Sequence, residues 1–150
     1  MIIDCHGHYT TAPKELEAFR QHQIAALTDP SQAPSKASLK ITDDQIRESL
    51  EKAQLKFQRE RGTDVTIFSP RASAMAHHIG DANTSALWSE VCNELIHRVC
   101  RLYPDNFVGV CQLLFGMIPP NRSRSLAGRT VFARAYSSAN LPSSTLRSVL

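Results

Sequence analysis

The stretch IIDCHGHYTTAPKELEAFRQHQIAAL, residues 2–27, decides the fold class because it predicts a short strand followed by a helix. Residues 2–5 form a largely apolar run that ends at two histidines, as a short strand would. Pro13 suits the first position of a helix, and Asp29 and Pro30 stop the helical stretch that follows. The opening therefore predicts one strand-then-helix unit.

The same order of elements continues along the chain. Thr42 is a good N-cap, Gln45 is placed to complete a capping box, and Gly62 can end the helix in the left-handed conformation. One apolar stripe is predicted along this helix from Ile46, Leu50, Ala53 and Phe57. The β-branched and apolar residues 65–68 then predict a second strand.

A third unit is predicted from a helix over residues 84–102 and a strand over residues 107–113. Strands that alternate with helices of this length indicate a parallel α/β fold. The pattern alone leaves open whether the sheet is open or part of a (β/α)8 barrel.

Composition and cysteine usage favour a cytoplasmic protein that binds no membrane. The 150 residues suffice for one domain, and no apolar run approaches the roughly 18 residues of a membrane span. No CxxC pair occurs, and we expect reduced core thiols at four positions, Cys5, Cys92, Cys100 and Cys111.

The distribution of charge divides the chain at residue 113. Residues 1–113 hold all fourteen acidic residues, whereas residues 114–150 hold five arginines, no lysine and no acid. A basic extension for nucleic acid or an acidic partner is one interpretation, but the arginines are scattered without aromatic residues arranged for base stacking. We favour the other interpretation, an aberrant tail from out-of-frame translation, and expect no nucleic-acid partner.

His6 and His8 are candidate metal ligands. Residues two apart in a strand project to the same face, and Gly7 leaves the backbone between them uncrowded. Imidazole is the commonest neutral ligand for Zn²⁺. A His-x-His pattern also arises often by chance, and the alternative is that both residues are hydrogen-bonded histidines of a loop. The position at the end of the first strand favours the metal interpretation.

Three stretches resemble the N-terminal part of the 4-oxalomesaconate hydratase family of the amidohydrolase superfamily, over residues 1–113. They are IIDCHGHYTTAP, LKITDDQIRESLEKAQLKFQRERGTDVTIFSPRASAMAHHIGD and VCNELIHRVCRLYPDNFVGVCQL. The resemblance implies a distorted (β/α)8 barrel with one divalent metal, usually zinc. It also implies hydration of 4-oxalomesaconate to 4-carboxy-4-hydroxy-2-oxoadipate in protocatechuate 4,5-cleavage, by a parent enzyme that is a homo-oligomer.

The same resemblance assigns roles to individual residues. His6 and His8 match the first-strand metal ligands, and a histidine and a glutamate from later strands should complete the site. Arg71, at the carboxyl end of the second strand, is a candidate clamp for a substrate carboxylate, with Ser73 as a hydrogen-bond donor beside it. A surface residue that caps a turn is the alternative for Arg71.

We expect only part of this site in the chain. Residues 112–150 contain no histidine, cysteine or carboxylate side chain, whereas a catalytic zinc site typically takes three protein ligands. The sequence therefore predicts the first three βα units of an incomplete barrel and a truncated hydratase of low activity. The alternatives are a related decarboxylase or hydrolase of an aromatic-derived acid, and a fragment with no catalytic role.

Overall fold

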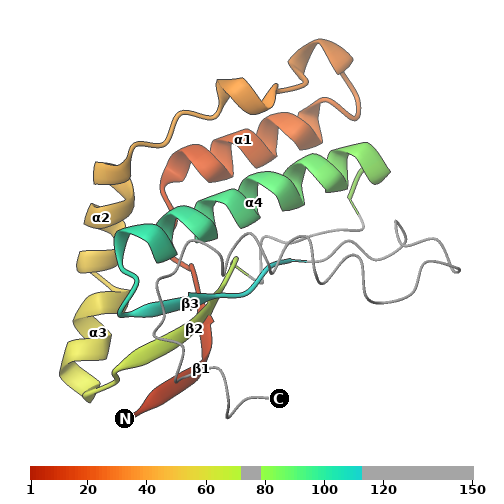
Figure 1. The fold of residues 1–150 in the computed structure, drawn as a ribbon. Coiled ribbons are helices and arrows are strands. Elements are labelled where there is room, and N and C mark those ends of the chain that lie inside the picture. The colour runs from red at the N-terminus through yellow and green to blue at the C-terminus, as the bar shows by residue number, and fades with distance from the viewer. Residues whose placement is uncertain (72–78, 113–150) are drawn as a thin grey trace, which may run out of the picture.

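The computed structural model describes residues 1–71 and 79–112. Within these ranges a parallel sheet is built from β1 (Ile3–His8), β2 (Val65–Ser69) and β3 (Phe107–Gly109), in the order β1-β2-β3. All described helices lie to one side of this sheet (Figure 1). The predicted parallel α/β class is confirmed.

Two long helices cover the sheet. Helices α1 (Lys14–Ala25) and α4 (Ala82–Leu102) lie side by side over it (Figure 1). The Arg20 guanidinium of α1 lies 5.1 Å from the ring centre of Trp88 in α4, and burial lowers the pKa of Arg20. This contact joins the two helices above the sheet.

Shorter helices connect the first unit to the second. Two short 3₁₀ turns, η1 (Pro30–Gln32) and η2 (Lys36–Ser38), lead from α1 into α2 (Asp43–Glu51). Helix α3 (Gln54–Arg61) then descends toward the start of β2 (Figure 1).

The predicted start and stop signals of the second helical region are confirmed. Thr42 Oγ1 accepts a hydrogen bond from the Gln45 amide at 3.2 Å, and Gln45 Oε1 accepts from the Thr42 amide at 2.8 Å. Gly62 ends the region in the left-handed conformation, with φ of 66°. The local sequence therefore sets both ends.

The prediction of one continuous apolar stripe in this region is wrong. Ala53 leaves the helical conformation, with φ of −133° and ψ of −89°, and separates α2 from α3. The break changes the rotation of the second half, so that Leu55 and Gln58 are buried while Phe57 is 49% exposed.

The third strand is shorter than the predicted range. Residues 110–112 follow β3 without strand structure, and Leu113 lies outside the described residues. The side chain of Asn93 in α4 makes two hydrogen bonds to the backbone of Gln112: its Nδ2 donates to the carbonyl at 3.0 Å, and its Oδ1 accepts from the amide at 2.7 Å.

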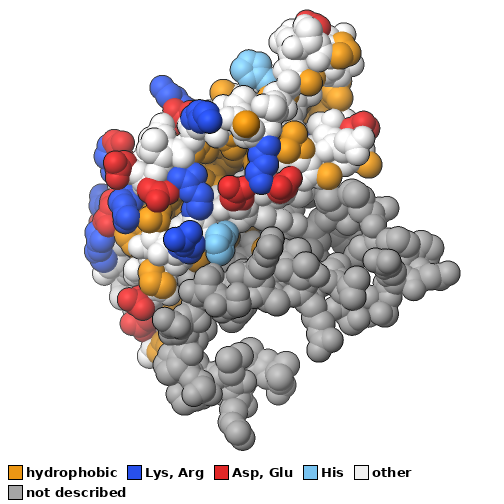
Figure 2. Space-filling view, turned by 45° about the horizontal axis from the view of Figure 1, so that its top comes forward, with side chains coloured by type: hydrophobic (Ala, Val, Ile, Leu, Met, Phe, Trp, Pro, Cys, Tyr) orange, Lys and Arg blue, Asp and Glu red, His pale blue; other side chains and the backbone are white. Residues whose placement is uncertain are grey.

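The core lies between the sheet and the helices. Aromatic rings from all three strand units meet there, with 4.7 Å between the ring centres of Phe68 and Phe107 and 5.4 Å between Tyr9 and Phe68. Helix α4 contributes buried residues on one stripe: Trp88, Val91, Cys92, Leu95, Ile96 and Val99. Figure 2 shows charged side chains of both signs mixed over the exposed helical face. Ion pairs between such exposed side chains contribute little to the free energy of folding.

We expect Thr42→Ala to lower the free energy of unfolding by about 1 kcal/mol, because the Gln45 amide loses its capping acceptor. Urea titration of the purified chain measures this change. Ser35→Ala is the matched control, since Ser35 precedes η2 without a side-chain capping bond. Equal losses in both variants would contradict the role of the capping box.

Candidate metal centre

The site begins with an irregularity in β1. The register of β1 on β2 shifts between Asp4 and Gly7, so that three residue steps of β1 match two of β2. This is the pattern of a β-bulge, which disrupts the alternation of side chains. Cys5 lies inside the bulge and is exposed, so the prediction that it is a core thiol is wrong.

Gly7 allows the two strands to approach closely at this point. A Cβ atom at Gly7 would lie 2.2 Å from Thr66 Cγ2 and 2.9 Å from the Ile67 carbonyl oxygen. Any larger residue would push β1 away from β2. Glycine at this position therefore fixes how the histidines on either side are presented.

The predicted convergence of His6 and His8 is present in the structure. Their Nε2 atoms lie 3.3 Å apart, and their ring planes are nearly perpendicular at 87°. Two imidazole nitrogens bound to one tetrahedral zinc ion, each at about 2.0–2.1 Å, are separated by about 3.3–3.4 Å. The spacing of the pair therefore fits joint coordination of one ion.

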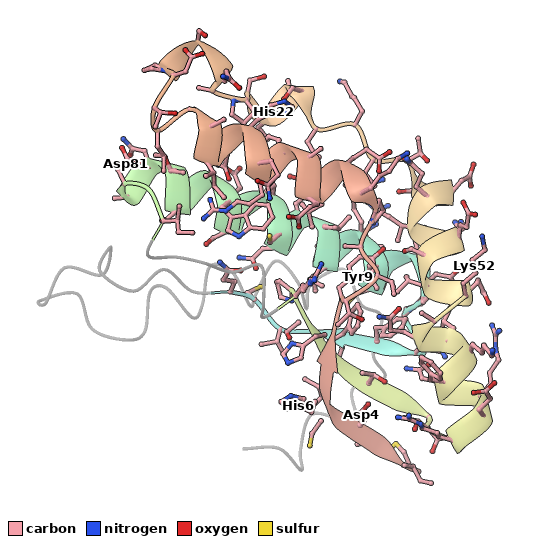
Figure 3. All side chains as sticks on the ribbon, turned by 180° about the vertical axis from the view of Figure 1, so that it is seen from behind. Asp4, His6, Tyr9, His22, Lys52 and Asp81 are labelled. Atoms are coloured by element: carbon pink, nitrogen blue, oxygen red, sulfur yellow. The ribbon has the colours of Figure 1, made fainter. Side chains whose placement is uncertain are left out.

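Neighbouring strands support the two histidines unequally. His8 pairs with Ser69 in the sheet, and His8 Nδ1 lies 2.6 Å from Ser69 Oγ. His6 is exposed, and its backbone amide donates to Asp4 Oδ1 at 3.0 Å. Figure 3 shows Asp4 on the side of β1 toward α3 and His6 on the other side. The His8 ring is therefore held by a hydrogen bond from the neighbouring strand, whereas His6 is held through its backbone amide.

The start of α3 holds the turn that follows His8. Gln54 Nε2 donates to the His8 carbonyl at 3.4 Å and lies 3.3 Å from Thr10 Oγ1. Thr11 Oγ1 donates to Gln54 Oε1 at 2.8 Å. Gln54 therefore links the end of β1 to α3.

An open groove of about 290 Å³ runs beside this edge of the sheet. Its lining includes both histidines, Asp4, Gln54 and Arg61. The volume is near the lower end of small-molecule sites, about 300–1,000 Å³. Because Gln54 and Arg61 belong to α3, the groove lies between β1 and α3, on the side of the strand where Figure 3 shows Asp4.

Tyr9 has a packing role. Its side chain is only 2% exposed, and its hydroxyl lies 2.6 Å from Ser49 Oγ. Burial raises the pKa of Tyr9 to about 12. The phenol stays protonated near neutral pH and belongs to the core.

Beyond the histidine pair, the sequence predicts Arg71 and Ser73 as substrate-binding residues. Arg71 lies two residues after β2 and is exposed, and its role toward a substrate carboxylate stays a prediction. Ser73 lies outside the described residues. Across residues 1–71 and 79–112, no group of three or more His, Cys, Asp or Glu side chains is placed to hold a metal ion.

Sequence reasoning missed Ser69 and Gln54. A signal for Ser69 was available, since it ends the second strand just as the histidines end the first, and parallel strands place these ends together. Gln54 gave no such signal, because its contact depends on the break between α2 and α3.

Comparison with known proteins identifies the family. Residues 3–126, more than half of the chain, match the Amidohydrolase family. The chain belongs to the amidohydrolase family. The family match runs to residue 126. The domain boundary predicted at residue 113 stays a prediction.

Two proteins that are similar to this chain carry hydratase names. The chain is 52% identical over 113 residues to 2-keto-4-carboxy-3-hexenedioate hydratase from Sphingobium sp., an alignment of 75% of this chain and 33% of that protein. The crystal structure of 4-oxalomesaconate hydratase from Rhodopseudomonas palustris matches with a TM-score of 0.77 and 48% identity, over 89% of this chain and 40% of that one.

The amidohydrolase chain therefore spans about one third of the length of the Sphingobium relative. Among its described helices, none is long and apolar enough to cross a membrane.

We expect Gly7→Ala to destabilise the chain by about 1–3 kcal/mol, because the added methyl group overlaps Thr66 Cγ2. Urea titration measures the loss. Adding Thr66→Ser removes the overlapping methyl group and keeps the hydroxyl that accepts from Gln58 Nε2, so the double variant should regain part of the stability. A Gly7→Ala chain as stable as wild type would refute the close approach.

Proposed function

We propose that the chain carries the N-terminal part of a metal-dependent hydratase site. The reaction is addition of water to 4-oxalomesaconate to give 4-carboxy-4-hydroxy-2-oxoadipate, a step of protocatechuate 4,5-cleavage in the cytoplasm. The observation that carries the proposal is the 3.3 Å approach of His6 Nε2 and His8 Nε2 at the end of β1. The likeness of this segment to named hydratases supplies the reaction.

The proposed framework is the first three βα units of a distorted (β/α)8 barrel. Parallel strands in sequential order, with helices on one side, are the arrangement of such a barrel. Active sites of this fold lie at the carboxyl ends of the strands, where His8 ends β1 and Ser69 ends β2. The uncovered side of the sheet corresponds to the barrel interior in this proposal.

His6 and His8 would hold the divalent cation, and zinc suits two neutral imidazoles. When bound, such a cation supplies Lewis-acid polarisation of an oxygen atom. Arg71 has the charge to bind a carboxylate of the polyanionic substrate, and the Ser73 hydroxyl can donate a hydrogen bond beside it. The hydration adds a hydroxyl group and a proton from water across one carbon-carbon double bond, and it needs no oxidant.

We propose low activity for this chain. The described residues bring together two imidazoles, whereas catalytic zinc sites typically use three protein ligands. Residues 112–150 offer no histidine, cysteine or carboxylate side chain to complete the set or to serve as general acid or base. A non-catalytic chain with weak metal binding is the second candidate, favoured by the same shortage of ligands.

We expect the purified 150-residue chain with added Zn²⁺ to hydrate 4-oxalomesaconate about 10³-fold more slowly than a full-length relative. An incomplete metal site forfeits several kcal/mol of charge stabilisation. Loss of the conjugated absorbance of the substrate, with product mass as a check, measures the rate. Turnover within tenfold of the full-length relative would contradict the incomplete set of metal ligands, and release of carbon dioxide would favour a decarboxylase instead.

A further inference from the structure

We propose that Ser69 is a positioning residue for the metal. The hydroxyl of Ser69 holds the His8 ring in the tautomer that carries its proton on Nδ1, so that Nε2 presents a lone pair to the cation. This inference rests on the proposed metal site, but the bond itself forms without metal.

The surroundings of Ser69 Oγ favour one direction of the bond. This oxygen lies 2.6 Å from His8 Nδ1, 3.1 Å from the Gly7 carbonyl oxygen and 3.4 Å from the Pro70 carbonyl oxygen. A carbonyl oxygen can only accept, and in our proposal the Gly7 carbonyl takes the single hydroxyl proton of Ser69. Ser69 Oγ is then left to accept from His8 Nδ1–H.

The tautomer has a direct consequence for metal binding. A neutral imidazole protonated on Nδ1 carries its free lone pair on Nε2. In this structure His8 Nε2 faces His6 Nε2 at 3.3 Å, the separation that joint coordination requires. A hydrogen bond to the remote ring nitrogen of a metal-binding histidine orients the ring and raises its basicity.

The two histidines differ in this respect. His8 and Ser69 are both half-buried, so water competes less for their bond. His6 is exposed, and within residues 1–71 and 79–112 its Nδ1 has no hydrogen-bond partner. Ser69 therefore prepares one ligand in advance, while His6 adjusts when the ion arrives.

Nitrogen-15 NMR of the imidazoles in the metal-free chain tests the bond. We expect wild-type His8 to show the Nδ1–H tautomer, and Ser69→Ala to shift it toward a mixture of tautomers. Ser69→Thr keeps a hydroxyl and should restore the wild-type spectrum. Ser49→Ala is the matched control, because it removes another 2.6 Å hydroxyl contact, that of Tyr9, and does not contact His8.

Calorimetry with Zn²⁺ on the same variants tests the consequence. We expect Ser69→Ala to weaken zinc binding about tenfold, with recovery in Ser69→Thr. His6→Ala should weaken it as well, and His22→Ala, which changes an exposed histidine of α1, should leave it unchanged. Circular dichroism of each variant checks that the fold is retained.

The outcomes separate this inference from the proposed function. A wild-type chain that binds Zn²⁺ while Ser69→Ala changes neither tautomer nor affinity overturns the role of Ser69. A wild-type His8 that carries its proton on Nε2 also overturns it. A wild-type chain with the Nδ1–H tautomer and no zinc binding instead contradicts the proposed metal site and upholds the bond.

Discussion

The parallel pairing of β1 with β2 around Gly7 is the contact on which the candidate site depends. The strands approach so closely there that a Cβ atom on Gly7 would overlap Thr66. The bulge just before it resets the register and leaves His8 opposite Ser69. Wider spacing of the strands would separate the Ser69 hydroxyl from the His8 ring. The ring would then lose the hydrogen bond that orients it.

The core behind the sheet gives this pairing its rigidity. Phe68 follows the close contact on β2 and is fully buried between Tyr9 and Phe107. Burying aromatic side chains supplies much of the free energy that holds such layers together. Residues that face the helices therefore fix the strands, while the histidines lie where a ligand can reach them.

The features that the sequence predicted correctly are those set by nearby residues. The capping box at Thr42 and Gln45 joins residues three apart, and the left-handed end at Gly62 follows from one residue type. The alternation of strands and helices, and the shared orientation of His6 and His8, also follow from local periodicity. The strand-end rule placed both histidines at the close of β1, and their role as metal ligands stays a proposal.

The features that the sequence did not predict depend on distant partners. The bulge that exposes Cys5 exists only as a register between two strands, and the break at Ala53 turns α3 toward the end of β1. The bond between His8 and Ser69 spans 61 positions along the chain. Periodicity within one segment carries no information on such contacts.

X-ray absorption spectroscopy of the zinc-loaded chain is the most direct test of joint coordination by His6 and His8, because it counts the nitrogen ligands around the ion. We expect two imidazole nitrogens at about 2.0–2.1 Å from zinc, and the loss of one of them in His6→Ala. A spectrum with oxygen ligands alone, or with a single imidazole in the wild-type chain, would contradict it.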